Sequence, residues 1–294
     1  MTPLHVALLL RDTAPVMLRE RDLRWCGFFS YPVPEFTWDH IFVTADEKMD
    51  RSILTSYDLL LVEDETRCTF TGDGPPVVFL TWDGTLSRER YKEKRRQAST
   101  ADLILVEHDH LEKYRCLGIP TRRVLFAVND HLFRDYELEK AVDVSFNCRL
   151  RHRPDRVTMD AFLLEFCATA GLRYGGGFIE DPVTYAKALN QSKIVVNLTK
   201  SPYNRNFRFF DVMASRACLL SSPLPYIEGD AADQERHWRT YENTAQLTGQ
   251  IVALLGHGAW QTVADAGYAL MRERYTWTVR AAELRQILRE ELGL

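Results

Sequence analysis

The chain has 294 residues, of which 46% are hydrophobic and 27% are charged, a composition typical of globular proteins that excludes a disordered or fibrous chain. The length allows two domains, and the formal net charge of −4 excludes a global attraction to nucleic acid or to an anionic membrane. It does not exclude a local basic patch.

The first half of the chain alternates short apolar runs with amphipathic stretches, which is the pattern of βαβ units around a parallel sheet. Each run is flanked by polar or turn residues, so together they predict one doubly wound domain. The expected strands are residues 5–10, 57–62, 77–80, 103–106 and 124–126.

A second series of the same kind follows the charged stretch 134–140. We therefore predict an N-terminal domain over residues 1–138, a C-terminal domain over 139–275, and a C-terminal helix within 276–294 that packs back on the body. The expected strands of the second series are residues 143–146, 174–178, 194–198 and 217–220, and the expected helices are 156–170, 183–190, 207–215 and 278–292.

The segment 87–96 is the most basic in the chain. Such a run is usually a solvated helix face in which charges pair at i,i+4 spacing. The alternative is a patch that contacts a polyanion, and the sequence leaves both interpretations open.

The stretch 201–222 carries the clearest chemical signal, because it follows an apolar strand and enters an amphipathic helix with Asn204 or Asn206 placed as the N-cap. A helix N-terminus at the carboxyl end of a parallel strand suits a diphosphate. Arg205 and Arg208 can add charge-assisted hydrogen bonds, and Asp211 can accept hydrogen bonds from ribose hydroxyls. An ordinary capped helix with surface arginines remains the alternative.

Five short motifs in this chain, taken in order, resemble the spore-maturation (CgeB-like) glycosyltransferases of the glycosyl transferase group 1 class. The resemblance extends over about residues 100 to 290, and each motif alone is weak, whereas their common order is more specific. They are Ala127-Val128-Asn129-x-x-Leu132-Phe133; Asp143-Val144-Ser145-Phe146 with Arg156; Tyr185-Ala186 with Asn190-x-Ser192-Lys193-Ile194 and Asn197; Asn206-x-Arg208-x-Phe210-Asp211-x-x-Ala214; and Tyr275-Thr276-Trp277-x-x-Arg280.

The resemblance implies a GT-B fold, in which two Rossmann-like doubly wound α/β domains face each other across a cleft. The C-terminal domain would bind a nucleotide-sugar donor, a UDP- or GDP-sugar, and the N-terminal domain would bind the acceptor. No tightly bound cofactor is implied. The residues implied at the donor are Asp211 at the ribose, the amides of Asn206, Phe207 and Arg208 at the diphosphate, and Arg149, Arg156 and Lys193 as charges that neutralise the leaving group.

Three residues depart from the family pattern. Asp211 stands where the family has Glu, and Cys148 and Arg216 stand where it usually has Gly. We expect these changes to alter how the phosphate-facing loops hold the donor.

The catalytic residues implied are Arg149 and Arg208 at the leaving group, with Asp12 or Asp83 as general base if the enzyme inverts configuration. Group 1 enzymes favour retention, for which no protein nucleophile is expected, and arginines with helix dipoles make a metal unnecessary. Turn capping is the simpler role for each carboxylate alone.

Two other clusters resemble metal sites, namely the pair His108 and His110 and the acidic run Glu63-Asp64-Glu65, which is similar to the metal motif of GT-A enzymes. Both follow apolar strands and are explained as polar loops. No metal ligand is therefore predicted.

Two alternatives to a conventional glycosyltransferase remain. One is a DNA-modifying glycosyltransferase that acts on a hydroxylated base, with the basic run 87–96 on the nucleic acid. The other is a non-catalytic nucleotide- or sugar-binding module on the same scaffold.

The expected location is the cytoplasm. No apolar run approaches the about 18 residues of a membrane span. The N-terminus predicts a strand rather than a signal peptide, and the six cysteines show no CxxC spacing, which indicates reduced thiols.

Overall fold

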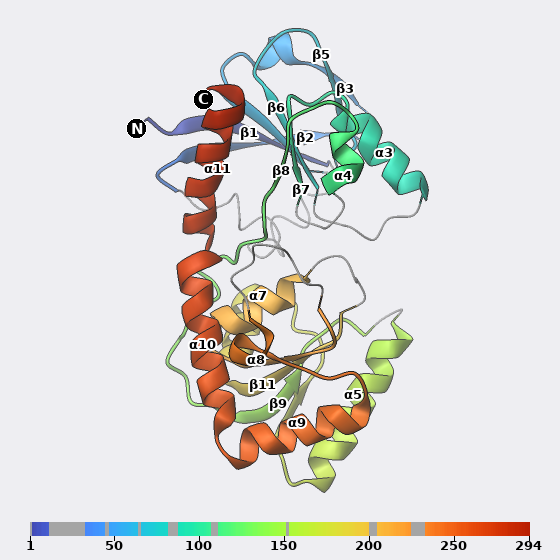
Figure 1. The fold of residues 1–294 in the computed structure, drawn as a ribbon, viewed down its shortest axis with the longest axis vertical. Coiled ribbons are helices and arrows are strands. Elements are labelled where there is room, and N and C mark those ends of the chain that lie inside the picture. Colours follow the sequence, from blue (N-terminus) through green and yellow to red (C-terminus); the bar gives the residue numbers. More distant parts are fainter. Residues whose placement is uncertain are drawn as a thin grey trace. The chain divides into compact units, whose positions relative to one another are not determined.

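The computed structural model describes residues 2–11, 33–44, 47–63, 66–81, 88–106, 111–150, 153–199, 205–224 and 233–294. The chain forms two compact units, of which unit 1 comprises Met1–Phe126 with Trp277–Leu294 and unit 2 comprises Ala127–Thr276 (Figure 1). The contacts thus change from one unit to the other at Ala127, upstream of the domain boundary predicted between residues 138 and 139.

Unit 1 contains a six-stranded parallel sheet with the strand order β2-β1-β4-β6-β7-β8. Its strands are β1 (Leu4–Arg11), β2 (Phe36–Val43), β4 (Leu59–Glu63), β6 (Val77–Thr81), β7 (Leu103–Val106) and β8 (Thr121–Arg123). A two-stranded sheet pairs β3 (Lys48–Asp50) with β5 (Thr69–Thr71), and the helices are η1 (Arg51–Leu54), α3 (Arg88–Ala98), α4 (Leu111–Arg115) and α11 (Trp277–Leu292).

Four of the five strands predicted for this half are confirmed, and the fifth, at residues 124–126, is wrong. The strand there is β8, whose polar residues Thr121–Arg123 pair with β7 at the edge of the sheet. Val124 and Phe126 are buried beyond its end. Their apolar character therefore reflects burial of the segment after the strand, and an edge strand needs apolar residues on one face at most.

Helix α11 belongs to unit 1 although it ends the chain. The ring of Trp277 at its start lies 6.4 Å from that of Trp38 on β2, and near its end Glu291 accepts a hydrogen bond of 2.6 Å from Nε of Arg122 on β8. The helix therefore contacts residues from opposite edges of the strand order.

Unit 2 contains a five-stranded parallel sheet with the order β10-β9-β11-β12-β13. Its strands are β9 (Val142–Phe146), β10 (Tyr174–Gly176), β11 (Ser192–Asn197), β12 (Cys218–Ser221) and β13 (Arg239–Thr240). Its helices are α5 (Pro154–Thr169), α6 (Pro182–Asn190), α7 (Phe207–Ala214), α8 (Gln234–His237), α9 (Thr244–Gly256) and α10 (Ala259–Arg274).

The strand order of unit 2 reverses between β9 and β11. The chain runs from β9 to β10 on one side and then passes back to β11 on the other. Because such crossovers are right-handed, α5 and α6 cover opposite faces of the sheet. In open sheets of this kind ligands bind at the carboxyl ends of the strands beside this reversal.

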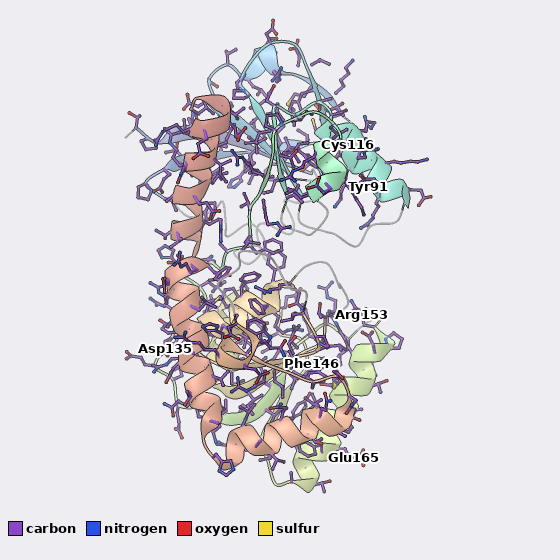
Figure 2. All side chains as sticks on the ribbon, in the orientation of Figure 1. Tyr91, Cys116, Asp135, Phe146, Arg153 and Glu165 are labelled. Atoms are coloured by element: carbon purple, nitrogen blue, oxygen red, sulfur yellow. The ribbon has the colours of Figure 1, made fainter. Side chains whose placement is uncertain are left out.

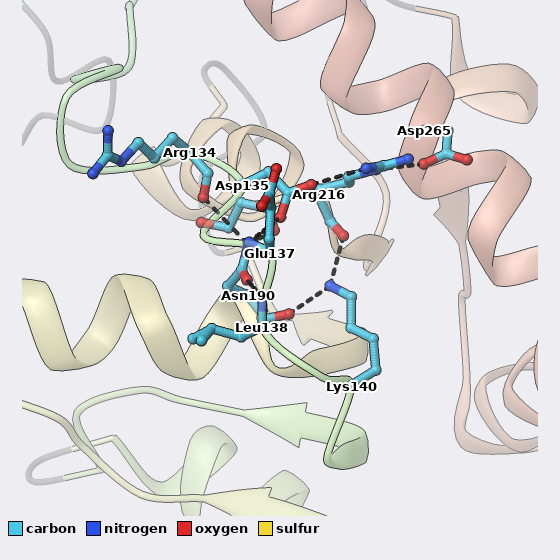
Figure 3. A network of polar contacts seen from close by, with 9 residues as sticks. Arg134, Asp135, Glu137, Leu138, Lys140, Asn190, Arg216 and Asp265 are labelled. Carbon is cyan, nitrogen blue, oxygen red and sulfur yellow. Dashed lines mark hydrogen bonds and ion pairs between the residues drawn. The ribbon is translucent and has the colours of Figure 1, made fainter.

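A polar network fixes the irregular segment 134–140 at the amino edge of this sheet (Figure 3). Arg216 pairs with Asp135 at 2.9 Å and with Asp265 of α10 at 2.7 Å. Nζ of Lys140 donates to the carbonyl oxygens of Asn190 at 2.6 Å and of Arg216 at 2.7 Å. Arg216 has a φ of 53°, a left-handed conformation for which glycine is the usual residue.

Within the described part of the chain, we find no helix that combines the length and the apolar character needed to cross a membrane.

Candidate functional site

The candidate site lies at the carboxyl edge of the unit 2 sheet. The described residues that follow the strands there are 147–150 after β9, 177–181 after β10, and 198–199 after β11. The segment after β9 leads into α5 and the one after β11 leads into α7. In Figure 2, Arg153 lies at the start of α5, beyond the strand that ends at Phe146.

Helix α7 begins at this edge with the N-cap that the sequence predicts at one of two asparagines. The side chain of Asn206 accepts a hydrogen bond from the amide of Phe209 at 3.2 Å, and its Nδ2 donates to Oδ1 of Asn197 at 2.9 Å. Asn206 is therefore held by the strand that precedes the helix. The positive end of the helix dipole then faces the carboxyl edge.

Arg208 in the first turn of α7 is 8% exposed. Its guanidinium donates through Nη2 to the carbonyl oxygen of Asn147 at 2.7 Å and through Nη1 to Oδ1 of Asn197 at 3.3 Å. Nε of Arg208 and the side-chain Oδ1 of Asn147, which is itself 5% exposed, are buried without a hydrogen-bond partner. A buried donor and a buried acceptor thus remain available at the reversal between β9 and β11.

Arg156 adds a second positive charge from the first turn of α5. It donates through Nη1 to the carbonyl oxygen of Arg149 at 3.3 Å. Burial lowers the pKa of Arg156, and the charges of Arg208 and Arg153 lower it further. Three like charges therefore lie close together, and an anion placed among them would relieve their repulsion.

Cys148 lies inside this arginine cluster and is 2% exposed. Burial raises the pKa of its thiol, although the charges of Arg208 and Arg156 oppose the shift. The thiol is therefore neutral at pH 7 and packs as a small apolar group.

Arg149, which the sequence analysis assigned to the diphosphate, is exposed and lies with its guanidinium carbon 4.8 Å from the ring centroid of Phe178. Phe178 follows β10 and is 45% exposed. Arg149 thus occupies the same edge as Arg208 and Arg156, but it engages an aromatic ring.

Asp211 lies three residues after Arg208 and four residues after Phe207 on α7, so it is a neighbour of each on the helix surface. Asp211 is 4% exposed. It is therefore buried, although the charge of a carboxylate predicts an exposed position on a helix surface.

Two residues of the predicted set lie at the opposite, amino edge. Nζ of Lys193, at the second position of β11, is 2.7 Å from Oδ1 of Asp143 near the start of β9. Arg216 precedes β12 and pairs with Asp135 and Asp265. The structure therefore does not bring Lys193 to the arginine cluster, and Arg216 is no part of a phosphate-facing loop.

Asp12 and Asp83, the two candidate general bases, lie outside the described residues, as do His108, His110, Asp64 and Glu65. Among the residues that the structure does describe, no group of three or more His, Cys, Asp or Glu side chains is placed to hold a metal ion.

The basic run 87–96 falls largely on α3. Arg96 pairs with Glu93 at 2.7 Å, and Lys94 is 3% exposed. Part of the positive charge in this run is therefore neutralised or buried.

Residues 162–286 match the protein family described as glycosyl transferase-like. The folds of solved glycosyltransferases match almost the whole chain, which shows that the protein has the predicted GT-B fold with two Rossmann-like α/β domains.

Among these solved structures is HepE of Anabaena in complex with UDP and glucose, which is 11% identical at a TM-score of 0.65 and covers 98% of this chain and 100% of its own. Sucrose-phosphate synthase of Thermosynechococcus elongatus is 12% identical at a TM-score of 0.62, with 99% of each chain covered. A glycosyltransferase of Rickettsia africae is 9% identical at a TM-score of 0.61, again with 99% of each chain covered. HepE was also solved with UDP-glucose. No curated protein matches the chain.

Two residues of the site, Asn147 and Phe178, were not predicted from the sequence. Their positions could have indicated them, because Asn147 directly follows β9 and Phe178 lies two residues beyond β10, where ligands bind in such sheets. Neutral amide and aromatic side chains carry no charge that singles them out in a sequence.

Proposed function

We propose that the protein is a glycosyltransferase that moves a sugar from a nucleotide-sugar donor, such as a UDP- or GDP-sugar, to an acceptor hydroxyl. The family match and the GT-B fold support the class of reaction. The observation that carries the assignment of the donor site is the buried Nε of Arg208, which has no hydrogen-bond partner and lies at the reversal of the sheet, where it can donate to a diphosphate oxygen. The unpartnered Oδ1 of Asn147 beside it can accept a hydrogen bond from a hydroxyl of the nucleotide sugar. We place the donor diphosphate at Arg208.

Positive charge at the arginine cluster supplies the chemistry that this placement needs. As the bond between the sugar C1 and the diphosphate oxygen breaks, negative charge develops on the diphosphate, and the acceptor oxygen forms the new bond to C1. Arg208, Arg156 and the N-terminus of α7 stabilise that charge, because they are held in position before the reaction begins. The proton of the acceptor hydroxyl passes to the diphosphate in a retaining reaction.

Finer assignments extend this proposal. Asp211 contacts the donor ribose, the amides of Asn206 and Phe207 contact the diphosphate, and unit 1 binds the acceptor. The reaction is retaining and needs no metal, since arginines provide the positive charge. If it instead inverts configuration, Asp12 or Asp83 serves as general base. The order of the motifs supports placing the protein with the CgeB-like glycosyltransferases.

Calorimetric titration of the protein with UDP, GDP, UDP-glucose and inorganic pyrophosphate, without added metal, tests the donor site. We expect at least one nucleoside diphosphate to bind and to raise the melting temperature, because a ligand that binds only the folded state stabilises it. Absence of binding and of any shift across all four ligands would overturn the assignment.

The same titration of the variant Arg208→Met tests whether Arg208 belongs to the donor site, in which case the variant should bind the ligand more weakly. Its matched control is Arg216→Ala, because Arg216 is also a paired arginine of unit 2 but lies at the amino edge. Loss of ligand binding in both variants would indicate a general effect on the fold rather than a donor site.

A further inference from the structure

Phe178 is a large aromatic side chain that remains 45% exposed at the carboxyl edge of the unit 2 sheet. It follows Gly177, whose φ of 93° turns the chain out of β10 in a conformation that favours glycine. The backbone thus presents Phe178 beyond the end of its strand. Nothing in the diphosphate chemistry above uses this residue.

Arg149 covers the Phe178 ring from the neighbouring strand β9, with 4.8 Å between the guanidinium carbon and the ring centroid. Gly176 of β10 pairs with Phe146 of β9. Phe178 comes two residues after Gly176, and Arg149 comes three residues after Phe146, so both side chains lie just beyond the same end of the sheet. Among the described residues no carboxylate forms an ion pair with Arg149. An exposed, flat arginine–aromatic pair therefore stands at this edge.

The pair lies beside the proposed diphosphate position. Strands β10 and β11 both neighbour β9, which places them two strand spacings apart, about 10 Å. Arg208 and Asn147 occupy the β9–β11 side of this interval, whereas Phe178 occupies the β10 side. A nucleoside attached to a diphosphate at Arg208 can extend along the edge toward Phe178.

We propose that Arg149 and Phe178 form a stacking platform for the nucleobase of the donor, an inference that rests on the proposed function. Aromatic rings and guanidinium planes both stack on bases. Since every base has a π face, the platform contributes affinity for any nucleotide and does not choose among bases. Arg149 is thus a base-binding residue, in place of the phosphate role expected from the sequence.

The test compares ligands with and without a base. In Phe178→Ala we expect the dissociation constants of UDP and GDP to rise about tenfold, as for the loss of one base–aromatic contact. Pyrophosphate, which has no base, should bind as it does to the wild type. Leu164→Ala on α5 is the matched control, because it removes an apolar side chain of the same unit that is 56% exposed.

Phe178→Trp gives a second readout. It retains the aromatic platform, so it should bind UDP within about threefold of the wild type, and UDP but not pyrophosphate should quench its added tryptophan fluorescence. Unchanged UDP affinity in Phe178→Ala, or an equal loss for UDP and pyrophosphate, would overturn the platform while leaving the donor site intact. Failure of the wild type to bind any of these ligands would overturn both proposals.

Discussion

The two edges of the unit 2 sheet use the same kinds of cation in opposite ways. At the amino edge, Asp143 accepts hydrogen bonds from Nε of Arg173 at 3.2 Å and from Lys193 at 2.7 Å, and Arg216 pairs with two further carboxylates. At the carboxyl edge, Arg208 meets a carbonyl and an amide oxygen, and the charge of Arg156 is opposed by other arginines. Arg153 pairs with Asp155 there, at 3.5 Å.

The difference indicates which edge is suited to bind an anion. Burial alone would raise the pKa of Asp143, yet the hydrogen bonds from Arg173 and Lys193 hold it well below its usual range. The cations of the amino edge are therefore already neutralised and serve the fold. At the carboxyl edge, Arg208 and Arg156 donate to neutral oxygens, so an anion bound there would compensate their charge, which is the property expected of a binding site.

Removal of the central carboxylate of the amino edge should produce the largest effect on stability. We expect Asp143→Ala to lower the free energy of unfolding by about 3 kcal/mol, because the buried carboxylate accepts hydrogen bonds from Lys193 and from the backbone amide of Arg173, and a hydrogen bond to a charged group contributes about 1.5 to 3 kcal/mol. Urea denaturation measures this loss. The affinity for UDP should be unchanged, and a marked fall in affinity would break the proposed division between the two edges.

The opposite pattern is expected for the carboxyl edge. Arg208→Met should weaken UDP binding by about 2 kcal/mol, roughly 30-fold, through loss of charge-assisted hydrogen bonds to the diphosphate. Calorimetric titration measures the affinity, and circular dichroism of the variant confirms that it is folded. Wild-type affinity in this variant would place the diphosphate elsewhere.

Two substitutions of Arg216 separate its backbone from its side chain. We expect Arg216→Ala to be less stable than Arg216→Gly by about 1 kcal/mol, because alanine keeps a Cβ at a φ of 53° and glycine does not. Thermal unfolding of the two variants side by side measures this difference. Equal stabilities would mean that the left-handed conformation costs little at this position.

The smallest expected effect concerns pH. Burial lowers the pKa of Lys140 from 10.5 to about 8. Between these values the unfolded chain binds more protons than the folded one, so this lysine makes stability rise with pH and contributes nothing further above 10.5. One pKa unit corresponds to about 1.4 kcal/mol, so the full shift sets an upper limit of about 3 kcal/mol. The ammonium group donates to two carbonyl oxygens, which favours the charged form and opposes the effect of burial, so we expect a rise in stability of under about 1 kcal/mol.

The contribution of Lys140 is isolated from that of other titrating groups by comparing the wild type with Lys140→Met. The difference in their free energies of unfolding is measured between about pH 8 and pH 10.5. A difference that falls with rising pH would contradict the assignment.

How far the sequence predicted this fold depends on the burial of each element. The apolar runs at β1, β7 and β9 predicted strands because parallel strands are covered on both faces. β8 was misplaced because an edge strand is polar. No element was predicted for α9 and α10. Gly249 lies inside α9 and lowers its helix propensity, and most of the charged residues of α10 gather in its last turn.

For the candidate site, capping chemistry predicted the start of α7, and with it Asn206 and Arg208, because the N-cap signal is local. The position of Lys193 could not be predicted in the same way. A shift of a few residues along a strand separates its amino end from its carboxyl end, and expected strand boundaries are not that precise. Arg149 lay at the predicted edge, but its contact with Phe178 joins two strands that are distant in sequence.

The network around Lys140 has a consequence for proteolysis. Residues 134–140 contain no helix or strand, and such segments are where trypsin usually cuts after an arginine or lysine. Here the ammonium group of Lys140 is bound to two carbonyl oxygens, and the amide of Asn190 donates to the carbonyl oxygen of Arg134. The peptide bonds after Arg134 and Lys140 cannot enter the cleft of a protease until these contacts open. The rate of cleavage at this segment therefore reports the opening of the amino edge of unit 2.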